Sequence, residues 1–519
     1  MRLIDPDKHG RLADFLITAA AVRPGHPALI VPAATTTFEQ LLSEARNLAH
    51  HLAANGTCPG SRVFLAMANS PAFAVAFWAV QLAGATAVPV NPATKPDKLA
   101  FMIGDAEPVL VIADPEIDIP DGPAVIRPAK EGQPFDHCTG AAPLPATARP
   151  DDLAAIIYTS GSTGNPKGVM LTQRNMVTAA CSVASYLGYR EDERIFCAIP
   201  FTFDYGLHQI TMSALVGCSL IVERDFSQPL MSLNRMARSN ATALPLVPTM
   251  AVLVNTLARR FDLSAIRIVT NTAAALGSEV IDGLRHSFPK ARLFSMYGLT
   301  ECHRCTFLAP EELEKRKTSV GKAIPFTEMW VVDDEGIAHR SGATGELVIS
   351  GDTVMAGYWR NEKATSQRLR PGPDGRMVLH TGDLCRLDDE GFCYFVGRRD
   401  EMLKVRGHKV APAEIEAALA RHPRIALAAI TGHPDPVLGT CLTAHVEPET
   451  GARLGEDEVA AHAASTLELH LRPARIVIVP VLPRTANGKI DKRALAAAAA
   501  MAPVLPSETS HEELSHEHV

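Results

Sequence analysis

Residues 159–168 combine glycines, hydroxyl side chains and one lysine, and they follow the apolar run 153–158 directly. Glycine lets backbone N–H groups approach an anion closely, serine and threonine hydroxyls donate to phosphate oxygens, and Lys167 adds a positive charge. The segment is therefore predicted to bind phosphate groups. It is not the common P-loop, because Pro166 precedes the lysine and Gly168 follows it.

Further residues have the chemistry that a nucleotide requires. Tyr297, Thr300 and Glu301 follow the end of a predicted strand. The tyrosine could stack on a base, the threonine could contact phosphate, and the glutamate could hold Mg²⁺. Asp383 could accept hydrogen bonds from ribose hydroxyls, and Lys489 lies on a glycine-containing loop that could reach over an active site.

These residues lie within an alternation of apolar strand-like runs and helical patterns. Helices are expected at 38–55 and 278–287. Strands are expected at 63–67, 85–90, 109–113, 156–159, 195–199, 219–222, 243–247, 266–270 and 292–295. This alternation predicts an α/β fold with layered, largely parallel sheets.

The pattern changes in the last third of the chain. Residues 325–396 contain short strands and turns, which predicts a β-rich subdomain. Helices at 413–421 and 457–469 and strands at 426–431, 443–446 and 475–479 follow. We therefore expect a large N-terminal domain at 1–399, a small mobile α+β domain at 400–497, and a disordered tail at 498–519.

Composition narrows the possible partners. The chain has 519 residues, and 47% of them are hydrophobic, which is enough for a large core. Because a chain of this length is too long for one compact unit, at least two domains are expected. A net charge of −7 without a basic block argues against nucleic acid. Ten scattered cysteines and an N-terminus without an apolar run favour a cytoplasmic protein. The apolar window 73–90 is interpreted as a buried helix and a strand, since Gly84 and Pro89 interrupt it, so no membrane span is expected.

At this point the chain resembles the adenylate-forming superfamily of acyl-CoA synthetases, peptide-synthetase adenylation domains and luciferases, over about residues 10–496. Nine motifs stand in the family's order: 159–168, 297–301, 345–348, 357–359, 381–383, 397–400, 404–407, 412–416 and 487–489. In such enzymes a carboxylate attacks the α-phosphate of ATP, pyrophosphate leaves, and a thiol then attacks the acyl adenylate.

The resemblance implies a role for each nucleotide-contacting residue. The residues that would order the triphosphate are Thr159, Ser160, Gly161, Ser162, Thr163, Gly164 and Lys167. Tyr297 would lie beside the adenine, Thr300 and Glu301 would serve phosphate and Mg²⁺, and Asp383 with Arg398 would hold the ribose.

The resemblance also implies roles in the small domain. Asp400 would be the hinge about which that domain turns, and Lys489 would bridge the substrate carboxylate and the α-phosphate. In the second half-reaction Lys404 and Gly407 would line the tunnel for a pantetheine thiol, either of CoA or of a phosphopantetheinylated carrier protein.

The acid pocket leaves two interpretations open. Phe203 stands where many acyl-CoA ligases carry a histidine, and Asp204 resembles the aspartate that binds the amino group in the amino-acid-activating branch. A buried aspartate needs a cation. That cation could be a substrate ammonium, or it could be Arg304 or His208.

We therefore expect an ATP- and Mg²⁺-dependent, AMP-forming ligase, monomeric or homodimeric, that makes a thioester. The favoured acid carries an amino or β-amino group and is loaded onto a carrier protein, as in stand-alone amino-acid adenylating enzymes. The alternatives are a fatty or aryl acyl-CoA synthetase and, in another class, a non-catalytic nucleotide-binding regulator. Cys302 and Cys305 are interpreted as incidental, since no second pair stands at zinc-ligand spacing.

Overall fold

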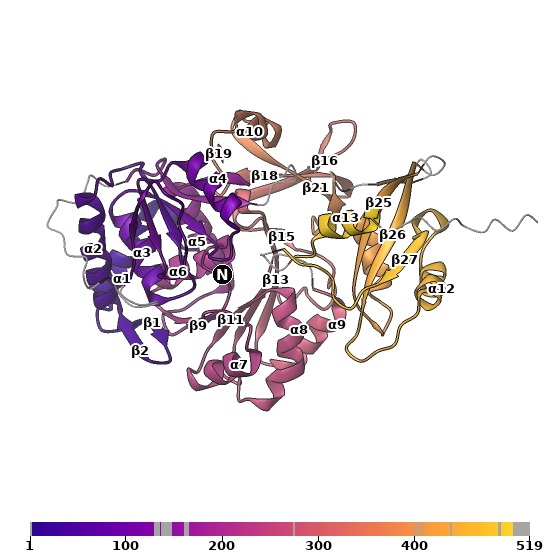
Figure 1. The fold of residues 1–519 in the computed structure, drawn as a ribbon, viewed down its shortest axis with the longest axis horizontal. Coiled ribbons are helices and arrows are strands. Elements are labelled where there is room, and N and C mark those ends of the chain that lie inside the picture. The colour runs from indigo at the N-terminus through magenta and orange to yellow at the C-terminus, as the bar shows by residue number, and fades with distance from the viewer. Residues whose placement is uncertain are drawn as a thin grey trace, which may run out of the picture. The chain divides into compact units, whose positions relative to one another are not determined.

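The computed structural model describes residues 3–128, 135, 148–159, 166–272, 276–399, 401, 403–405, 408–435, 439–485 and 489–501. The chain forms two compact units, Met1–Arg399 and Asp400–Val519. The first unit is built on three large sheets with helices beside them, and the second is a small α+β unit (Figure 1).

A nine-stranded sheet carries much of the first unit, in the order β15-β14-β13-β12-β11-β9-β10-β1-β2. Its strands are β1 (Pro27–Val31), β2 (Ala34–Thr37), β9 (Arg194–Cys197), β10 (Ser219–Val222), β11 (Ala243–Leu246), β12 (Ile268–Asn271), β13 (Arg292–Tyr297), β14 (Thr306–Leu308) and β15 (Lys322–Ala323). The central pairs are parallel, whereas β2, β14 and β15 pair antiparallel at the two edges.

The second large sheet has seven strands, in the order β19-β8-β7-β4-β3-β5-β6. They are β3 (Arg62–Ala66), β4 (Thr86–Val90), β5 (Leu110–Ala113), β6 (Ala124–Ile126), β7 (Leu153–Thr159), β8 (Lys167–Thr172) and β19 (Gly357–Tyr358). Strands β8 and β19 are antiparallel additions to a parallel sheet.

The third sheet of the first unit is antiparallel and corresponds to the predicted β-rich subdomain. It comprises β16 (Thr327–Val332), β17 (Ala338–His339), β18 (Ala343–Gly351), β20 (Leu369–Pro371), β21 (Met377–Leu387) and β22 (Cys393–Arg398). Helix α10 (Glu362–Arg368) lies between β19 and β20 in sequence.

The helices of the first unit complete its layers. They are η1 (Pro6–Lys8), α1 (Ala13–Val22), α2 (Phe38–Ala54), α3 (Pro71–Leu82), α4 (Pro96–Ala106), α5 (Gln173–Leu187), α6 (Asp204–Val216), α7 (Pro229–Arg238), α8 (Pro248–Leu257), η2 (Ala258–Arg260), α9 (Ser278–Ser287) and η3 (Thr300–Cys302). Helix α2 begins with a capping box between Thr37 and Gln40. Helix α3 is apolar on nearly all sides and buried throughout, and one hydrophobic core contains residues of both parallel sheets.

The second unit contains two small sheets. Strands β23 (Leu403–Val405) and β24 (His408–Val410) form a hairpin, and β25 (Ile425–Asp435), β26 (Gly439–Pro448) and β27 (Arg475–Ile478) form the other sheet. Its helices are α11 (Pro412–Leu419), α12 (Glu456–Thr466), η4 (Leu469–Leu471) and α13 (Lys492–Met501). This unit has its own hydrophobic core, which includes Val410, Ile415 and Val446.

The expected fold class is confirmed, with a large α/β N-terminal part and a small C-terminal part. The predicted tail needs one correction, because α13 extends to Met501 and so includes residues 498–501. Its alanine run has the highest intrinsic helix propensity, and residues 502–519 lie outside the described residues. In the described chain, no helix has both the length and the apolar character that a membrane crossing requires.

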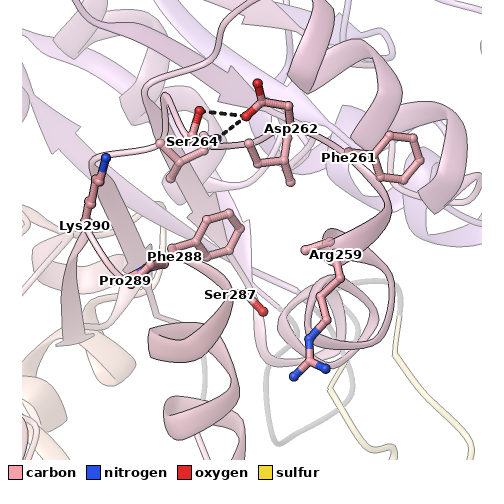
Figure 2. Close-up of a pocket in the computed structure, with 11 residues that line it drawn as sticks. Arg259, Phe261, Asp262, Ser264, Ser287, Phe288, Pro289 and Lys290 are labelled. Atoms are coloured by element: carbon pink, nitrogen blue, oxygen red, sulfur yellow. Dashed lines mark hydrogen bonds between the residues drawn. The ribbon is translucent and has the colours of Figure 1, made fainter.

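A surface cavity of about 240 Å³ lies between the segment after η2 and the end of α9 (Figure 2). It is lined by apolar residues such as Phe261 and Phe288, with Arg259 and Lys290 at its side. Its turn is held by Asp262, whose carboxylate accepts from the backbone and side chain of Ser264. It contains no residue predicted to bind nucleotide or acid.

Candidate active site

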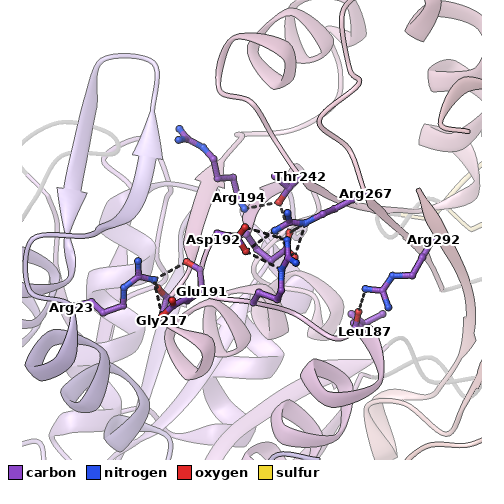
Figure 3. Close-up of polar contacts among 11 residues, drawn as sticks. Arg23, Leu187, Glu191, Asp192, Arg194, Gly217, Thr242, Arg267 and Arg292 are labelled. Atoms are coloured by element: carbon purple, nitrogen blue, oxygen red, sulfur yellow. Dashed lines mark hydrogen bonds and ion pairs between the residues drawn. The ribbon is translucent and has the colours of Figure 1, made fainter. Parts of the chain in front are cut away.

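In the nine-stranded sheet, the amino ends and the carboxyl ends of the strands carry different kinds of residue. At the amino ends of its strands, buried Glu193 accepts hydrogen bonds from Arg267 at 3.0 and 3.1 Å and from Thr242. Arg267 also pairs with Asp192 at 2.8 Å, so β9, β11 and β12 are joined at this edge (Figure 3). The predicted acid-pocket residues and the predicted magnesium residues Thr300 and Glu301 instead follow the carboxyl ends of β9 and β13, where ligands bind in open α/β sheets.

The ends of the predicted phosphate loop are held by a hairpin. Thr159 is the last residue of β7 and pairs with Lys167, the first residue of β8. The Lys167 ammonium lies 5.4 Å from the centroid of the Tyr358 ring. Between these two strands, Ser160, Gly161, Ser162, Thr163 and Gly164 lie outside the described residues.

Thr300 and Glu301 lie on the loop that joins the antiparallel strands β13 and β14. One carboxylate oxygen of Glu301 accepts a hydrogen bond of 2.7 Å from the Tyr358 hydroxyl. The other oxygen accepts no hydrogen bond from the described residues and is available to a cation. The motif containing Tyr358 is recognisable in the sequence, but its contact with Glu301 is not predicted by any sequence signal.

The same loop depends on Gly298. A Cβ at this position would lie 2.3 Å from the backbone oxygen of His303, on the opposite side of the loop. We therefore expect Gly298→Ala to displace the segment that carries Glu301 and to cost about 1–3 kcal/mol of unfolding free energy. Thermal unfolding and pyrophosphate release with ATP would measure both effects. Unchanged stability and rate would contradict this account of the loop.

Strand pairing brings the two predicted ribose residues together, and the predicted adenine residue Tyr297 reaches one of them from another sheet. Asp383 on β21 lies directly opposite Arg398 on β22, and the ion pair between them measures 3.3 Å. The Tyr297 hydroxyl donates to the other carboxylate oxygen of Asp383. Burial raises the pKa of Asp383, and Arg398 and Tyr297 oppose that rise. Its Oδ1 accepts no hydrogen bond from the described residues, so a ribose hydroxyl could donate to it.

Glu346, on the adjacent strand β18, binds the backbone and side chains beside Asp383. It accepts from the backbone N–H of Gly382 at 3.0 Å and from Arg399 at 3.0 Å, and lies 3.3 Å from His380. Burial opposes ionisation, but the contact with His380, the Gly382 N–H and Arg399 together lower the pKa of Glu346 to about 2.

This contact set predicts a pH-dependent contribution to stability. Because the folded pKa lies below the ordinary value of 4.5, the contribution is complete above that pH and is lost as the pH falls toward about 2. We expect Glu346→Gln to lower the unfolding free energy by about 1–3 kcal/mol at neutral pH. Urea unfolding at a series of pH values should show the difference from wild type shrinking in acid. A difference that does not change with pH would refute the assignment.

The acid-pocket residues form a buried ion pair. Asp204, the first residue of α6, and Arg304, on the β13–β14 loop, are 5% and 3% exposed, and 3.1 Å separates Oδ2 from Nη1. Arg304 also donates to the backbone oxygen of His303 at 2.6 Å and lies over the ring of Tyr205. Phe203 precedes the helix and packs against the core. Among the described residues, Arg304 is the cation that pairs with Asp204.

Two histidines lie beside this ion pair. His208 is one helical turn after Asp204, and His303 precedes Arg304. Their rings stack with centroids 5.0 Å apart. The sequence suggests His208 only as a possible cation, and it contains no signal that the two rings meet.

The small unit carries the remaining predicted residues. Lys489 is exposed, and its backbone oxygen accepts from the Thr485 N–H at 2.7 Å. The backbone of Lys404 belongs to β23. Asp400 and Gly407 lie outside the described residues, so their predicted roles stay predictions.

Cys302 and Cys305 are both fully buried, with their sulfurs 2.9 Å apart. Within the described residues no group of three or more His, Cys, Asp or Glu side chains could hold a metal ion. A zinc site built on this pair therefore has no support among those residues.

Comparison with known proteins agrees with this geometry. Residues 16–359 match the family model of the AMP-binding enzymes, and residues 414–489 match that of the AMP-binding enzyme C-terminal domain. A rice (Oryza sativa subsp. japonica) 4-coumarate–CoA ligase 5 is 32% identical over 95% of each chain. A linear gramicidin synthase of Brevibacillus parabrevis is 30% identical over 91% of this chain but 6% of its own length.

Solved structures of the same kind superpose on most of the chain. ATP-bound MatB from Rhodopseudomonas palustris gives a TM-score of 0.85 at 27% identity, covering 94% of this chain and 98% of that one. O-succinylbenzoate coenzyme A synthetase from Bacillus subtilis, in complex with ATP and magnesium ion, gives 0.81 at 26% identity, covering 92% and 98%. The chain therefore belongs to the AMP-binding enzyme family and is an AMP-forming acid–thiol ligase that uses ATP.

Proposed function

We propose that this protein is a CoA ligase for a carboxylic acid that carries no amino group. The buried ion pair between Asp204 and Arg304 supports this proposal most directly. An ammonium group in the pocket would need a counter-charge, and the Asp204 carboxylate already has one. A second buried cation beside Arg304 would be left uncompensated, at a cost of several kcal/mol.

The reaction would follow from the positions of the described residues. Asp383 would accept a hydrogen bond from the ribose, and Lys167 would contribute positive charge to the phosphates. The acid carboxylate would attack the α-phosphate, and pyrophosphate would leave. Lys489 would stabilise the negative charge that increases on the carboxylate and α-phosphate oxygens in the transition state.

Magnesium would be held at Glu301 and Thr300. The free carboxylate oxygen of Glu301 fits a hard cation, and Mg²⁺ typically takes one or two protein oxygens with the remainder from phosphate and water. When bound, the ion would neutralise phosphate charge. The Tyr358 hydroxyl would keep the carboxylate oriented, since it donates to one oxygen and leaves the other to the cation.

CoA is the proposed thiol acceptor. The rice CoA ligase matches this chain over 95% of both lengths, whereas the gramicidin synthase match is a small part of a much longer protein. We propose that Lys404 and Gly407 line the path of the pantetheine arm and that Asp400 is the hinge between the two half-reactions.

A second candidate is an amino-acid ligase that loads a carrier protein. The observation in its favour is Asp204 itself, at the start of α6 after Phe203, together with the similarity to a gramicidin synthase. It requires the substrate ammonium to replace or share the Arg304 contact.

One experiment separates the two candidates. Pyrophosphate release is measured with ATP, Mg²⁺ and a panel of fatty, aryl, α-amino and β-amino acids, followed by thioester formation with CoA or with a phosphopantetheinylated carrier protein. The variant is Asp204→Leu combined with Arg304→Met, because removing one partner alone would leave a buried charge unpaired.

We expect wild type to turn over non-amino acids and to transfer them to CoA, and the double variant to keep adenylation within about tenfold of wild type, a change of about 1.4 kcal/mol in activation free energy. Turnover confined to amino acids and abolished in the double variant would overturn the proposal in favour of the carrier-protein candidate. Ala429, in the small unit's core, offers a control site, where Ala429→Ser should leave acid preference unchanged.

A further inference from the structure

His208 and His303 form a stacked pair that the adenylation chemistry does not use. His208 lies on α6 and His303 on the β13–β14 loop, and the side chains are 2% and 1% exposed. Their ring planes differ by 19°. Both are close in sequence to the acid-pocket ion pair. His208 is one helical turn after Asp204, and His303 immediately precedes Arg304.

Three ring nitrogens of this pair lack a partner. Nε2 of His208 and both Nδ1 and Nε2 of His303 make no hydrogen bond with the described residues. Buried polar groups in native proteins are nearly always satisfied by protein, water or ligand. Two adjacent imidazoles with unsatisfied nitrogens therefore indicate a place where another polar group binds.

The backbone of His303 supports the same conclusion. Its φ of 56° with ψ of −74° is a sparsely populated conformation for a residue with a side chain. Such conformations persist only where surrounding contacts enforce them, and they are concentrated at ligand sites. Here the Arg304 hydrogen bond and the close approach of Gly298 hold the His303 carbonyl.

The charge of the cluster limits what can bind. Burial lowers the pKa of His208, and His303 and Arg304 lower it further. Burial and then Arg304 lower the pKa of His303 to about 3. Both rings are therefore neutral at pH 7, and the charge of Arg304 is balanced by Asp204. Together, His208, His303, Asp204 and Arg304 carry no net charge that could offset an ammonium group or a second carboxylate on the ligand.

We propose that His208 and His303 recognise a hydroxyl group of the acid, either an alcohol or a phenol, and that the enzyme selects hydroxy acids. This inference rests on the proposed function, which puts the acid beside Asp204 and Arg304. A neutral imidazole offers one N–H donor and one acceptor nitrogen. A hydroxyl, which both donates and accepts one bond, matches the N–H of one ring and the bare nitrogen of the other.

Matched acids test the proposal. Pyrophosphate release is measured with cinnamate and its para-hydroxy, para-amino and para-carboxy derivatives, and with straight-chain acids of several lengths that end in methyl, hydroxyl, ammonium or carboxylate groups. A site built to hydrogen-bond a hydroxyl discriminates strongly against the analogue that lacks it. We expect kcat/KM for the best hydroxy acid to exceed that of its unsubstituted parent by about 100-fold or more.

His208→Phe keeps the ring but removes the nitrogens. We expect it to bring the hydroxy-to-parent ratio of kcat/KM close to one, mainly by lowering the rate with the hydroxy acid, while the melting temperature stays the same or rises. His445→Phe is the matched control. That histidine is also buried, but it lies in the small unit and is bonded to Thr431, so the ratio should not change.

Failure of hydroxyl recognition and failure of ligase activity give different results. Equal turnover of hydroxy and parent acids, or a preference that survives His208→Phe, overturns the hydroxyl assignment and leaves the ligase intact, with water as the partner of the histidines. A preference for the carboxy or amino derivatives overturns it as well. Release of pyrophosphate with none of the acids overturns the proposed function and the inference together.

Discussion

Replacing Lys489 by alanine is expected to slow acyl-AMP formation by about 100- to 1,000-fold, the usual effect of losing one group that stabilises transition-state charge. The lysine is exposed in the small unit, and its backbone oxygen accepts a hydrogen bond from the Thr485 N–H. The loss should appear mainly in kcat. The affinity for ATP, measured by calorimetry, should change much less, because the proposed interaction strengthens as charge builds up.

A second lysine provides the control. Lys492 pairs with Glu416 at 2.8 Å and Glu401 at 3.5 Å within the same unit, so Lys492→Ala should affect stability more than adenylation. Thioester formation from preformed acyl-AMP should survive Lys489→Ala, since that step does not need the lysine in the proposed mechanism. An unchanged rate of pyrophosphate release would exclude Lys489 from the first half-reaction.

Arg304→Ala is expected to lower the free energy of unfolding of the large unit by about 3–5 kcal/mol. The substitution leaves Asp204 buried and unpaired, and it also removes the stacking of the guanidinium on Tyr205. Asp204→Leu alone should be destabilising for the corresponding reason, because it leaves the guanidinium without its counter-charge. These are among the largest effects expected from single changes in this chain.

A double variant tests whether the unpaired buried charge causes this loss of stability. Asp204→Leu with Arg304→Met replaces both charges by apolar groups, and such replacements are often neutral or stabilising. The double-mutant cycle built from Asp204→Leu, Arg304→Met and their combination, measured by urea unfolding, should therefore give a strongly favourable coupling energy. Additive effects of the two changes would show that the charges do not depend on each other.

Most of the parallel strands were predictable because they are continuous apolar runs with a helix between them, whereas β1 and β6 were not predicted. The predicted run at 219–222 coincides with β10, and the helix predicted at 278–287 coincides with α9. The short antiparallel strands β14, β15 and β19 were not predicted. They are two or three residues long, and their pairing is set by distant segments, so they leave no periodic pattern in the sequence.

Those site residues that belong to a recognisable motif were predictable from the sequence, whereas contacts between distant segments were not. The pairing of Asp383 with Arg398 follows from two motifs that are neighbours in the β-rich sheet. The contact of His208 with His303 depends on how helix α6 packs against the β13–β14 loop, across 95 positions of sequence. The spacing of residues contains no information about that packing, and the same holds for the hydroxyl of Tyr358 on Glu301, 57 positions away.

The network around Glu193 joins the amino ends of β9, β11 and β12, whereas the acid pocket follows the carboxyl ends of β9 and β13. The network that joins the strands and the proposed acid pocket thus lie at opposite ends of the same strands. A change in the pocket leaves the Glu193 network intact, but the pocket's own buried ion pair contributes to stability. New acid preferences at Asp204 and Arg304 would therefore have to arise by paired substitutions, since either single change leaves a buried charge without its partner.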